Sequence, residues 1–163
     1  MPARSPKKTQ AVRLLESKGI MHRVTVYDDA GEFHSGEEAA ALVGAPAEAV
    51  YKTLVVVRDP PSGRPMLVIV PVAGQANLKT LAAARGEKRL RMATQKEAEK
   101  LTGMQVGGIS ALAVPAGRFD VLLDEAARSL EMIHVSAGAR GVDVELAVAD
   151  LVRLTDASYT TAT

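Results

Sequence analysis

Hydrophobic positions recur along the chain at two spacings, one typical of helices and one typical of strands. Val12 and Leu15 lie on one face of a helix that Gly19 ends. The residues before the proline-rich turn at 59–65 are almost all apolar, as in a buried strand. The pattern predicts helices over residues 9–18, 39–43, 77–84, 94–103 and 147–151, a short helix after Asp124, strands over 22–27, 50–58, 66–70, 90–93, 119–123 and 131–135, a short apolar strand before Pro115, and a further strand from Val142.

Polar residues at the ends of these segments support their boundaries. Ser35 with Glu38, and Thr94 with Glu97, have the spacing of a capping box, in which side chains satisfy backbone groups of the first helical turn. The hairpin at 50–70 and the short links elsewhere indicate antiparallel strand pairs. We therefore expect an α+β fold with a mixed, curved β-sheet and helices packed around it, as a single domain over residues 1–163.

Composition narrows the functional classes. The chain has 163 residues, of which 47% are hydrophobic and 24% are charged, a balance typical of globular domains. It contains no cysteine, which removes disulfides, thiolate metal sites and a cysteine nucleophile. Because no apolar run approaches the roughly 18 residues of a membrane span, we expect no membrane partner and a cytoplasmic location.

Charge is unevenly distributed, although the formal net charge is +1. Residues 1–19 carry five basic side chains and one acidic one, residues 24–51 carry six acidic and no basic ones, and residues 85–100 carry six basic and three acidic ones. A basic face could attract nucleic acid, but charges that simply solvate helices explain the same pattern. With three Tyr, two Phe and no Trp, a long platform of stacked bases is not expected, and neither is a DNA partner.

Lys52 is an unusual residue in its segment, because it interrupts the apolar run at 50–57. Alternation along a strand places its side chain on the face of Leu54 and Val56, and the side chain of Thr53 on the other face. A buried charge without a partner is costly. The ammonium group therefore either extends to solvent at the strand end or meets an anionic group in a cleft.

Two glycine-containing segments offer further polar groups. Gly107 and Gly108 either form a plain tight turn or bring backbone N–H groups close to an anion. A second loop carries Ser136, Arg140 and Asp143. Asp143 either lines a site with its neighbours or pairs with Arg140 at the surface.

Motifs for other chemistries are absent from the sequence. His22, His34 and His134 have no metal-ligand spacing, so we expect no metal site. The sequence has no GxSxG, Walker A or GxGxxG motif either, and nothing marks an enzyme with its own nucleophile. No cofactor is expected.

Several short segments match one known family when they are taken together. They are the stretches at 9–16, 71–75, 102–103 and 135–136, with Val-Tyr-Lys-Thr at 50–53, Val-Gly-Gly-Ile-Ser at 106–110 and Arg-Gly-Val-Asp-Val-Glu-Leu at 140–146. In order and spacing the sequence resembles the YbaK-type Cys-tRNA(Pro) deacylases, relatives of the editing domain inserted in bacterial prolyl-tRNA synthetase. The resemblance covers nearly the whole chain.

The resemblance implies that the protein clears cysteine mis-attached to tRNA(Pro), either with water or with help from the substrate's own thiol. The implied partners are aminoacyl-tRNA, with tRNA(Pro) expected, and a complex with prolyl-tRNA synthetase. Catalytic roles are implied for Lys52, Gly108 and Asp143. The expected substrate contacts are Tyr27, Thr53, Gly107, Ile109, Ser110, Ser136 and Arg140.

Two departures from the family pattern leave an alternative open. The family usually has proline where this chain has Ala111, and often Gly-Lys where this chain has Gly138-Ala139. The alternative is a non-catalytic module that binds tRNA or docks on a synthetase. Lys52, the paired glycines and Asp143 occur together, which favours the deacylase. A lyase that forms a Schiff base through Lys52 would need an adjacent acid or base, which the neighbouring sequence does not supply. The amino acid removed, whether cysteine, alanine or another small residue, is left open.

Overall fold

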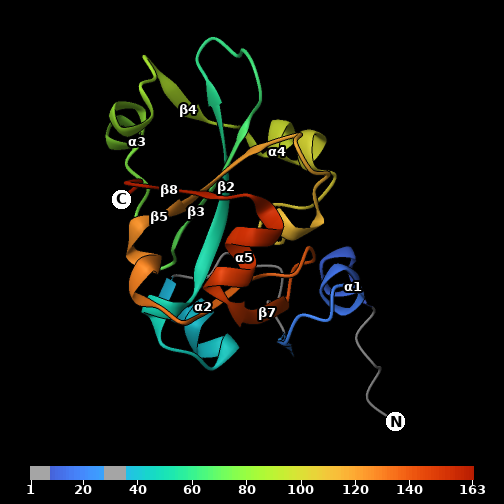
Figure 1. Cartoon of the computed structure of the whole chain (residues 1–163). Coiled ribbons are helices and arrows are strands. Elements are labelled where there is room, and N and C mark those ends of the chain that lie inside the picture. Colours follow the sequence, from blue (N-terminus) through green and yellow to red (C-terminus); the bar gives the residue numbers. More distant parts are fainter. Residues whose placement is uncertain (1–7, 28–35) are drawn as a thin grey trace.

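The computed structural model describes residues 8–27 and 36–163, and within them helices flank strands that form two β-sheets (Figure 1). The α-helices are α1 (Gln10–Ser17), α2 (Gly36–Val43), α3 (Leu78–Arg85), α4 (Gln95–Thr102) and α5 (Val148–Thr155). Single turns of 3₁₀ helix are η1 (Ala47–Ala49), η2 (Ala111–Ala113) and η3 (Glu125–Ser129). The predicted cap at Ser35 lies outside the described residues.

The smaller sheet is antiparallel throughout. Its order is β1 (His22–Val26), β7 (Val142–Ala147) and β6 (Met132–Ser136). One face is apolar and buried in the core, with Ile133, Val135, Val144 and Leu146 each at most 3% exposed. The opposite face carries the polar residues of the same strands, as the alternation of side chains requires.

The larger sheet is mixed. Its order is β4 (Leu90–Met92), β2 (Tyr51–Arg58), β3 (Met66–Pro71), β5 (Asp120–Asp124) and β8 (Ser158–Thr160). β2 pairs antiparallel with β3 and β4, whereas β3 with β5 and β5 with β8 run parallel. The predicted α+β class with a mixed sheet is confirmed. The parallel pairs arise where the chain returns to the sheet after long connections, from β3 to β5 and from β5 to β8.

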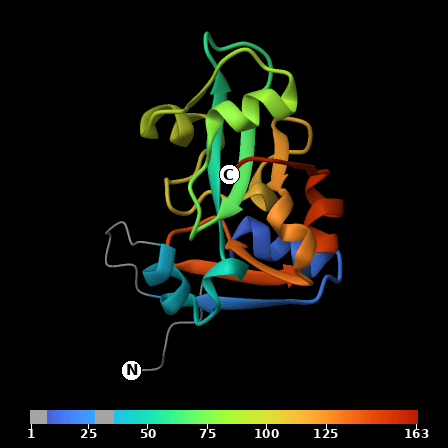
Figure 2. The same ribbon diagram turned by 90° about the vertical axis from the view of Figure 1, so that its left-hand side faces the viewer.

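One backbone contact joins the two sheets beside β2. Val50 forms a parallel bridge with His134, just before β2 begins and within β6. The main core fills the space between the sheets, α1 and α5. A second, smaller core lies on the other face of the large sheet, where α3 covers Val56, Val68 and Val70 (Figure 2).

Local sequence signals explain most of the helix boundaries. Thr9 and Asn77 cap α1 and α3, and Thr94 with Glu97 forms a complete capping box on α4. Gly103 ends α4 in the left-handed conformation at φ 73°. The apolar strand predicted before Pro115 is wrong: the segment forms η2, because the Ser110 hydroxyl accepts a hydrogen bond from the Leu112 N–H at 3.2 Å and caps a 3₁₀ turn.

Candidate functional site

The two glycine loops of the sequence lie directly against each other. A Cβ atom on Gly108 would lie 2.6 Å from the backbone nitrogen of Arg140 and 2.7 Å from the carbonyl carbon of Ala139. The side chain of Arg140 passes over Gly107, and the side chain of Ser110 adjoins Gly138. Because no Cβ fits at Gly108, the absence of a side chain there is what allows the loops to meet.

The backbone of the Gly-Gly segment forms a turn. Gly107 has φ 95°, and the N–H of Gly108 donates to the carbonyl of Gln105 at 2.9 Å. Gly107 and Gly108 therefore lie in a turn, in which the N–H of Gly108 already donates to another residue. Within the described chain, the N–H groups of Gly107 and Ile109 donate to no acceptor.

The polar face of the small sheet brings together residues from its three strands. Asp143 on β7 lies opposite Thr25 on β1 and Ser136 on β6. The Ser136 hydroxyl accepts a hydrogen bond from the Gly138 N–H at 3.3 Å, which ties the strand end to the glycine loop. We call Thr25, Ser136 and Asp143, with the polar residues beside them on this face, the polar row. It adjoins the contact between the two loops.

His134 also belongs to the polar row. Its spacing from other histidines had indicated no metal site and assigned it no other role. Its Nδ1 lies 2.8 Å from Oδ2 of Asp143 and its Nε2 lies 3.1 Å from Oε2 of Glu145. The hydrogen bond with Asp143 raises the pKa of His134, against an opposing effect of burial. Burial raises the pKa of Asp143, and the hydrogen bond with His134 partly offsets this rise. Both partners are buried, so their charges depend on each other.

The arrangement around Asp143 decides between two interpretations of the sequence. Asp143 is 4% exposed, so a surface pair with Arg140 is wrong. His134 contacts Asp143 diagonally across β6 and β7, because the residue directly opposite Asp143 is Ser136. The alternation of His134 with Ser136 on one strand, and of Asp143 with Glu145 on the other, was visible in the sequence. The cross-strand register that joins them was not.

Tyr27 is attached to the same loop through its backbone. Its N–H donates to the carbonyl of Gly141 at 2.8 Å. A Cβ on Gly141 would lie 2.6 Å from the carbonyl oxygen of Tyr27, and Gly141 has φ 78°. Tyr27, which follows β1 directly, therefore lies in contact with the loop that carries Arg140.

Lys52 lies on the same side of the molecule as this polar row. Residues paired across a bridge point to one side of a sheet, and side chains alternate along each strand. Because Val50 pairs with His134, Lys52 shares a side with Ser136. The side chain of Lys52 is partly buried and has no hydrogen bond or ion pair in the described parts of the chain. Lys52 was predicted to share a strand face with Leu54 and Val56. This is confirmed, because β2 runs without interruption from Tyr51 to Arg58 and both of these residues pack in the smaller core on that face.

The side chain of Thr53 points to the face of β2 opposite that of Lys52, because side chains alternate along a strand. Its neighbours of equal parity, Tyr51 and Val55, lie in the main core between the sheets. The structure thus brings the polar row against the glycine loops, and strand alternation places Lys52 on the side of the polar row, while the side chain of Thr53 leaves β2 on the opposite face.

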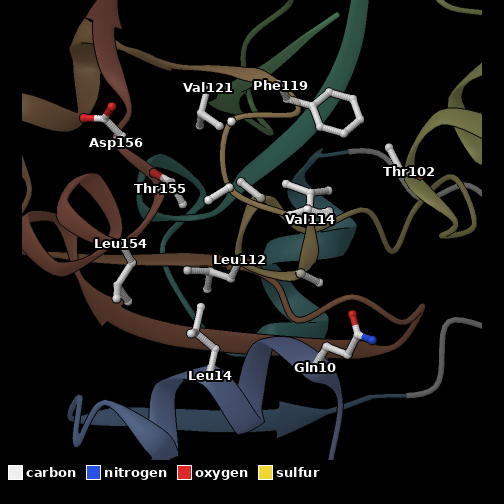
Figure 3. Close-up of a pocket in the computed structure, with 15 residues that line it drawn as sticks. Gln10, Leu14, Thr102, Leu112, Val114, Phe119, Val121, Leu154, Thr155 and Asp156 are labelled. Atoms are coloured by element: carbon white, nitrogen blue, oxygen red, sulfur yellow. The ribbon is translucent and has the colours of Figure 1, made fainter. Parts of the chain in front are cut away.

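A cavity of about 630 Å³ lies elsewhere, between α1, the segment at 111–117 and the end of α5 (Figure 3). Leu14, Leu112 and Leu154 extend into it, and Asp156 is the charged residue among those that line it in the described chain. None of the residues predicted for catalysis or substrate binding lines this cavity. We place the candidate site at the polar row, because chemistry needs the ionisable groups that converge there.

Residues 8–27 and 36–163 contain no group of three His, Asp or Glu side chains placed to hold a metal ion. In the same ranges no helix has the length and apolar character needed to cross a membrane.

Comparisons with known proteins identify the relatives of this chain. A sequence model of the aminoacyl-tRNA editing domain matches residues 31–154. A protein of Enterococcus faecalis named "Putative Cys-tRNA(Pro)/Cys-tRNA(Cys) deacylase EbsC" is 30% identical over 156 residues, which cover 96% of this chain and 93% of the relative.

Solved structures show the same fold. One, described as a "putative trans-editing enzyme for prolyl tRNA synthetase", is similar with a TM-score of 0.81 and 23% identity, covering 99% of both chains. Another, of a hypothetical protein, has a TM-score of 0.80 and 24% identity, covering 94% of this chain and 98% of the other. The resemblance carried by the sequence motifs is confirmed, and the chain belongs to the aminoacyl-tRNA editing domain family.

Proposed function

We propose that this chain is a trans-editing deacylase that removes cysteine from mischarged Cys-tRNA(Pro). The observation that carries the proposal is Lys52, a partly buried residue that has no hydrogen bond or ion pair with the described residues and lies on the same side as Ser136. A free cation beside a polar row suits an anionic substrate group in a chain of the editing family. The name of the Enterococcus relative supports the choice of amino acid.

The selection problem explains why such an enzyme is needed. A synthetase pocket shaped for proline cannot strongly reject amino acids of similar or smaller size, because one missing methylene changes binding by only about 1–3 kcal/mol. A second site that admits small side chains and excludes the correct one supplies the remaining discrimination. Gly107, Gly108 and Gly138 place no side chains at the loop contact, which would suit a site for small amino acids.

The proposed reaction uses the thiol of the substrate, since the sequence has no cysteine and no GxSxG motif that would mark a nucleophile of its own. The thiolate attacks its own ester carbonyl carbon and forms a C–S bond. The tetrahedral intermediate expels the ribose oxygen of the tRNA, which takes up a proton, and water then opens the resulting thiolactone to free cysteine. A free cysteine thiol has a pKa of about 8.5, and the Lys52 ammonium nearby would raise its thiolate fraction at neutral pH.

The protein groups would mainly orient and stabilise. The free N–H groups of Gly107 and Ile109 would donate to the developing oxyanion, while Gly108 contributes by letting the loops close. The Asp143 carboxylate, held by His134, would bind the α-ammonium group of the aminoacyl ester. Lys52 would stabilise either the oxyanion or the phosphate of the terminal nucleotide. Tyr27, Ser110, Ser136 and Arg140 would border the substrate, whereas Thr53 supports the strand from its opposite face.

The deciding experiment is deacylation by the purified full chain of cysteinyl-, alanyl- and prolyl-tRNA(Pro), with and without prolyl-tRNA synthetase. We expect cysteine to be released fastest, prolyl-tRNA to be spared, and EDTA to have no effect. Faster turnover in the presence of the synthetase would support a complex. Release of proline at the cysteine rate would contradict the proposal.

Seryl-tRNA(Pro) tests the nucleophile, because serine differs from cysteine only by oxygen for sulfur. A hydroxyl is almost wholly protonated at neutral pH, so seryl turnover should be far slower, and cysteinyl turnover should rise with pH through the titration of the thiol. Equal rates for the two substrates would point to attack by water.

The departures at Ala111 and Ala139 favour a second candidate, a module that binds tRNA or docks on a synthetase without catalysis. Ala111 lies in η2 beside Ser110, and Ala139 contacts Gly108, so both residues border the loop contact. Tight tRNA binding with no turnover on any small aminoacyl-tRNA would select this candidate over the deacylase.

A further inference from the structure

The end of the large sheet furthest along β2 from Lys52 carries many exposed cations. Six of them have exposed side chains that form no ion pair or hydrogen bond in the part of the chain that the structure describes. We call them the basic surface: Arg85, Lys88, Arg89, Lys96, Lys100 and Arg118.

These residues lie at one end of the large sheet, those near α3 on one of its faces and those on α4 on the other. Three lie where α3 leads into β4, and two lie one turn apart on α4. The carbonyl of Arg89 accepts from the N–H of Asp59 at the tip of the β2–β3 hairpin. Lys100 and Arg118 line a cavity of about 510 Å³ together with Arg58. Both views show α3, β4, α4 and the hairpin tip at the same end of the molecule (Figures 1 and 2).

The carboxylates of this region do not neutralise it. Two are held in bidentate pairs by arginines outside the basic surface: Glu87 with Arg58 at 2.7 and 2.9 Å, and Glu97 with Arg91 at 2.8 and 3.0 Å. Asp120 pairs with Arg64, another arginine outside the basic surface, at 3.8 Å. Asp59 and Glu99 form no ion pair in the described residues, although Asp59 lies close enough to Arg91 to interact with it, so six cations face at most two carboxylates outside ion pairs. Glu99 is partly screened, because it accepts the N–H of Val106 at 3.0 Å.

We propose that the basic surface binds the phosphate backbone of the acceptor arm of tRNA. The proposal rests on the proposed function, which supplies an aminoacyl-tRNA as substrate. Exposed Lys and Arg side chains without partners can bind phosphates and release counterions, which gives affinity without reading sequence. The aromatic ring of this region, Phe119, is buried, so stacking of bases is not available.

The distance between the basic surface and the candidate site determines which nucleotides of the tRNA the basic surface can contact. Lys52 and Arg58 are six residues apart on β2, or about 20 Å at 3.3 Å per residue. About six stacked nucleotides span that distance at roughly 3.4 Å each. With the aminoacyl ester at Lys52, the basic surface meets nucleotides well inside the acceptor arm. It therefore contributes to binding of tRNA and not to the chemical step.

The test compares two double variants with a matched control. Lys96→Gln/Lys100→Gln and Lys88→Gln/Arg89→Gln each remove two cations of the basic surface. Arg13→Gln/Lys18→Gln removes two exposed cations, one in α1 and one at its C-cap, that likewise form no side-chain ion pair or hydrogen bond in the described residues. The dissociation constant for uncharged tRNA is measured at several salt concentrations, and deacylation is measured on Cys-tRNA(Pro) and on 3′-cysteinyl-adenosine.

We expect each basic-surface variant to weaken tRNA binding about tenfold at low salt, with the slope of log Kd against log salt shallower by up to about one for each lost contact. Turnover of 3′-cysteinyl-adenosine should stay unchanged, while kcat/KM on Cys-tRNA(Pro) falls with the affinity. Unchanged tRNA affinity in both variants, or an equal loss in the control, overturns the proposal. A wild-type chain that deacylates neither substrate defeats the proposed function instead, and the binding measurement still decides the basic surface.

Discussion

Polar groups near the two ends of β2 differ in burial and in pairing. At the Tyr51 end, His134 and Asp143 are buried and satisfy each other, and the glycine loops leave no room for one more carbon atom. At the Arg58 end, the cations of the basic surface are exposed and unpaired in the described chain.

The difference separates two kinds of sensitivity. A buried charge is tolerated only with a partner, so substitutions near Asp143 affect folding as well as chemistry. An exposed cation contributes little to stability, because water and salt screen it. We therefore expect changes at the first end to alter stability or turnover, and changes at the second end to alter affinity for the substrate.

Lys52→Ala should show the largest effect and test whether the first end is catalytic. If its ammonium group contacts charge that develops in the transition state, turnover should fall by roughly 10²-fold or more, while thermal unfolding changes little. Lys52→Arg should also fail, because a planar guanidinium does not replace a compact ammonium group. Normal turnover with a normal melting curve would mean that the side chain merely extends to solvent.

Gly108→Ala should follow, because its Cβ would lie against the backbone of Arg140. Forcing the loops apart should cost about 2 to 3 kcal/mol of unfolding free energy, as overpacking usually does, and should also slow deacylation. Gly74→Ala is the matched control, since a Cβ there meets nothing closer than 3.6 Å. Equal urea midpoints for the two variants would show that the loops separate without cost.

The charge state of His134 gives a smaller, pH-dependent effect. Its pKa is raised in the folded chain, so its contribution to stability is complete below the ordinary value of 6.5 and is lost as pH rises through the raised value. We expect a loss of about 1.5 kcal/mol, typical of a hydrogen bond to a charged group. Urea unfolding across this range should show the step in the wild type and not in His134→Gln. A step of equal size in the variant would assign it to another group.

Thr94→Ala should have the smallest effect and act at the other end. Removing the capping side chain of α4 should cost about 1 kcal/mol of stability. Turnover of 3′-cysteinyl-adenosine should be unaffected, since α4 carries cations of the basic surface and no residue of the candidate site. A loss of turnover on this minimal substrate would show that the two ends are coupled.

The parts of the fold that depend on nearby residues were predictable from the sequence. The capping box at Thr94, the hairpin and the face of Lys52 all follow from spacings of a few residues. The contact between His134 and Asp143 requires the register of β6 against β7, and the bridge to Val50 joins residues far apart in sequence. Neither leaves a local signal. The strand β8 was missed for the same reason, because it pairs in parallel with β5.

Because Val50 is bridged to His134, the register of β2 decides which of its alternating side chains face the polar row. β2 is locked in register by its ladders to β3 and β4. A slip of one residue would exchange the two faces, turning the lysine toward the main core and the threonine toward the polar row. Evolution can therefore vary many side chains along this strand, but a change that shifts its pairing by an odd number of residues would erase the site while leaving the composition intact.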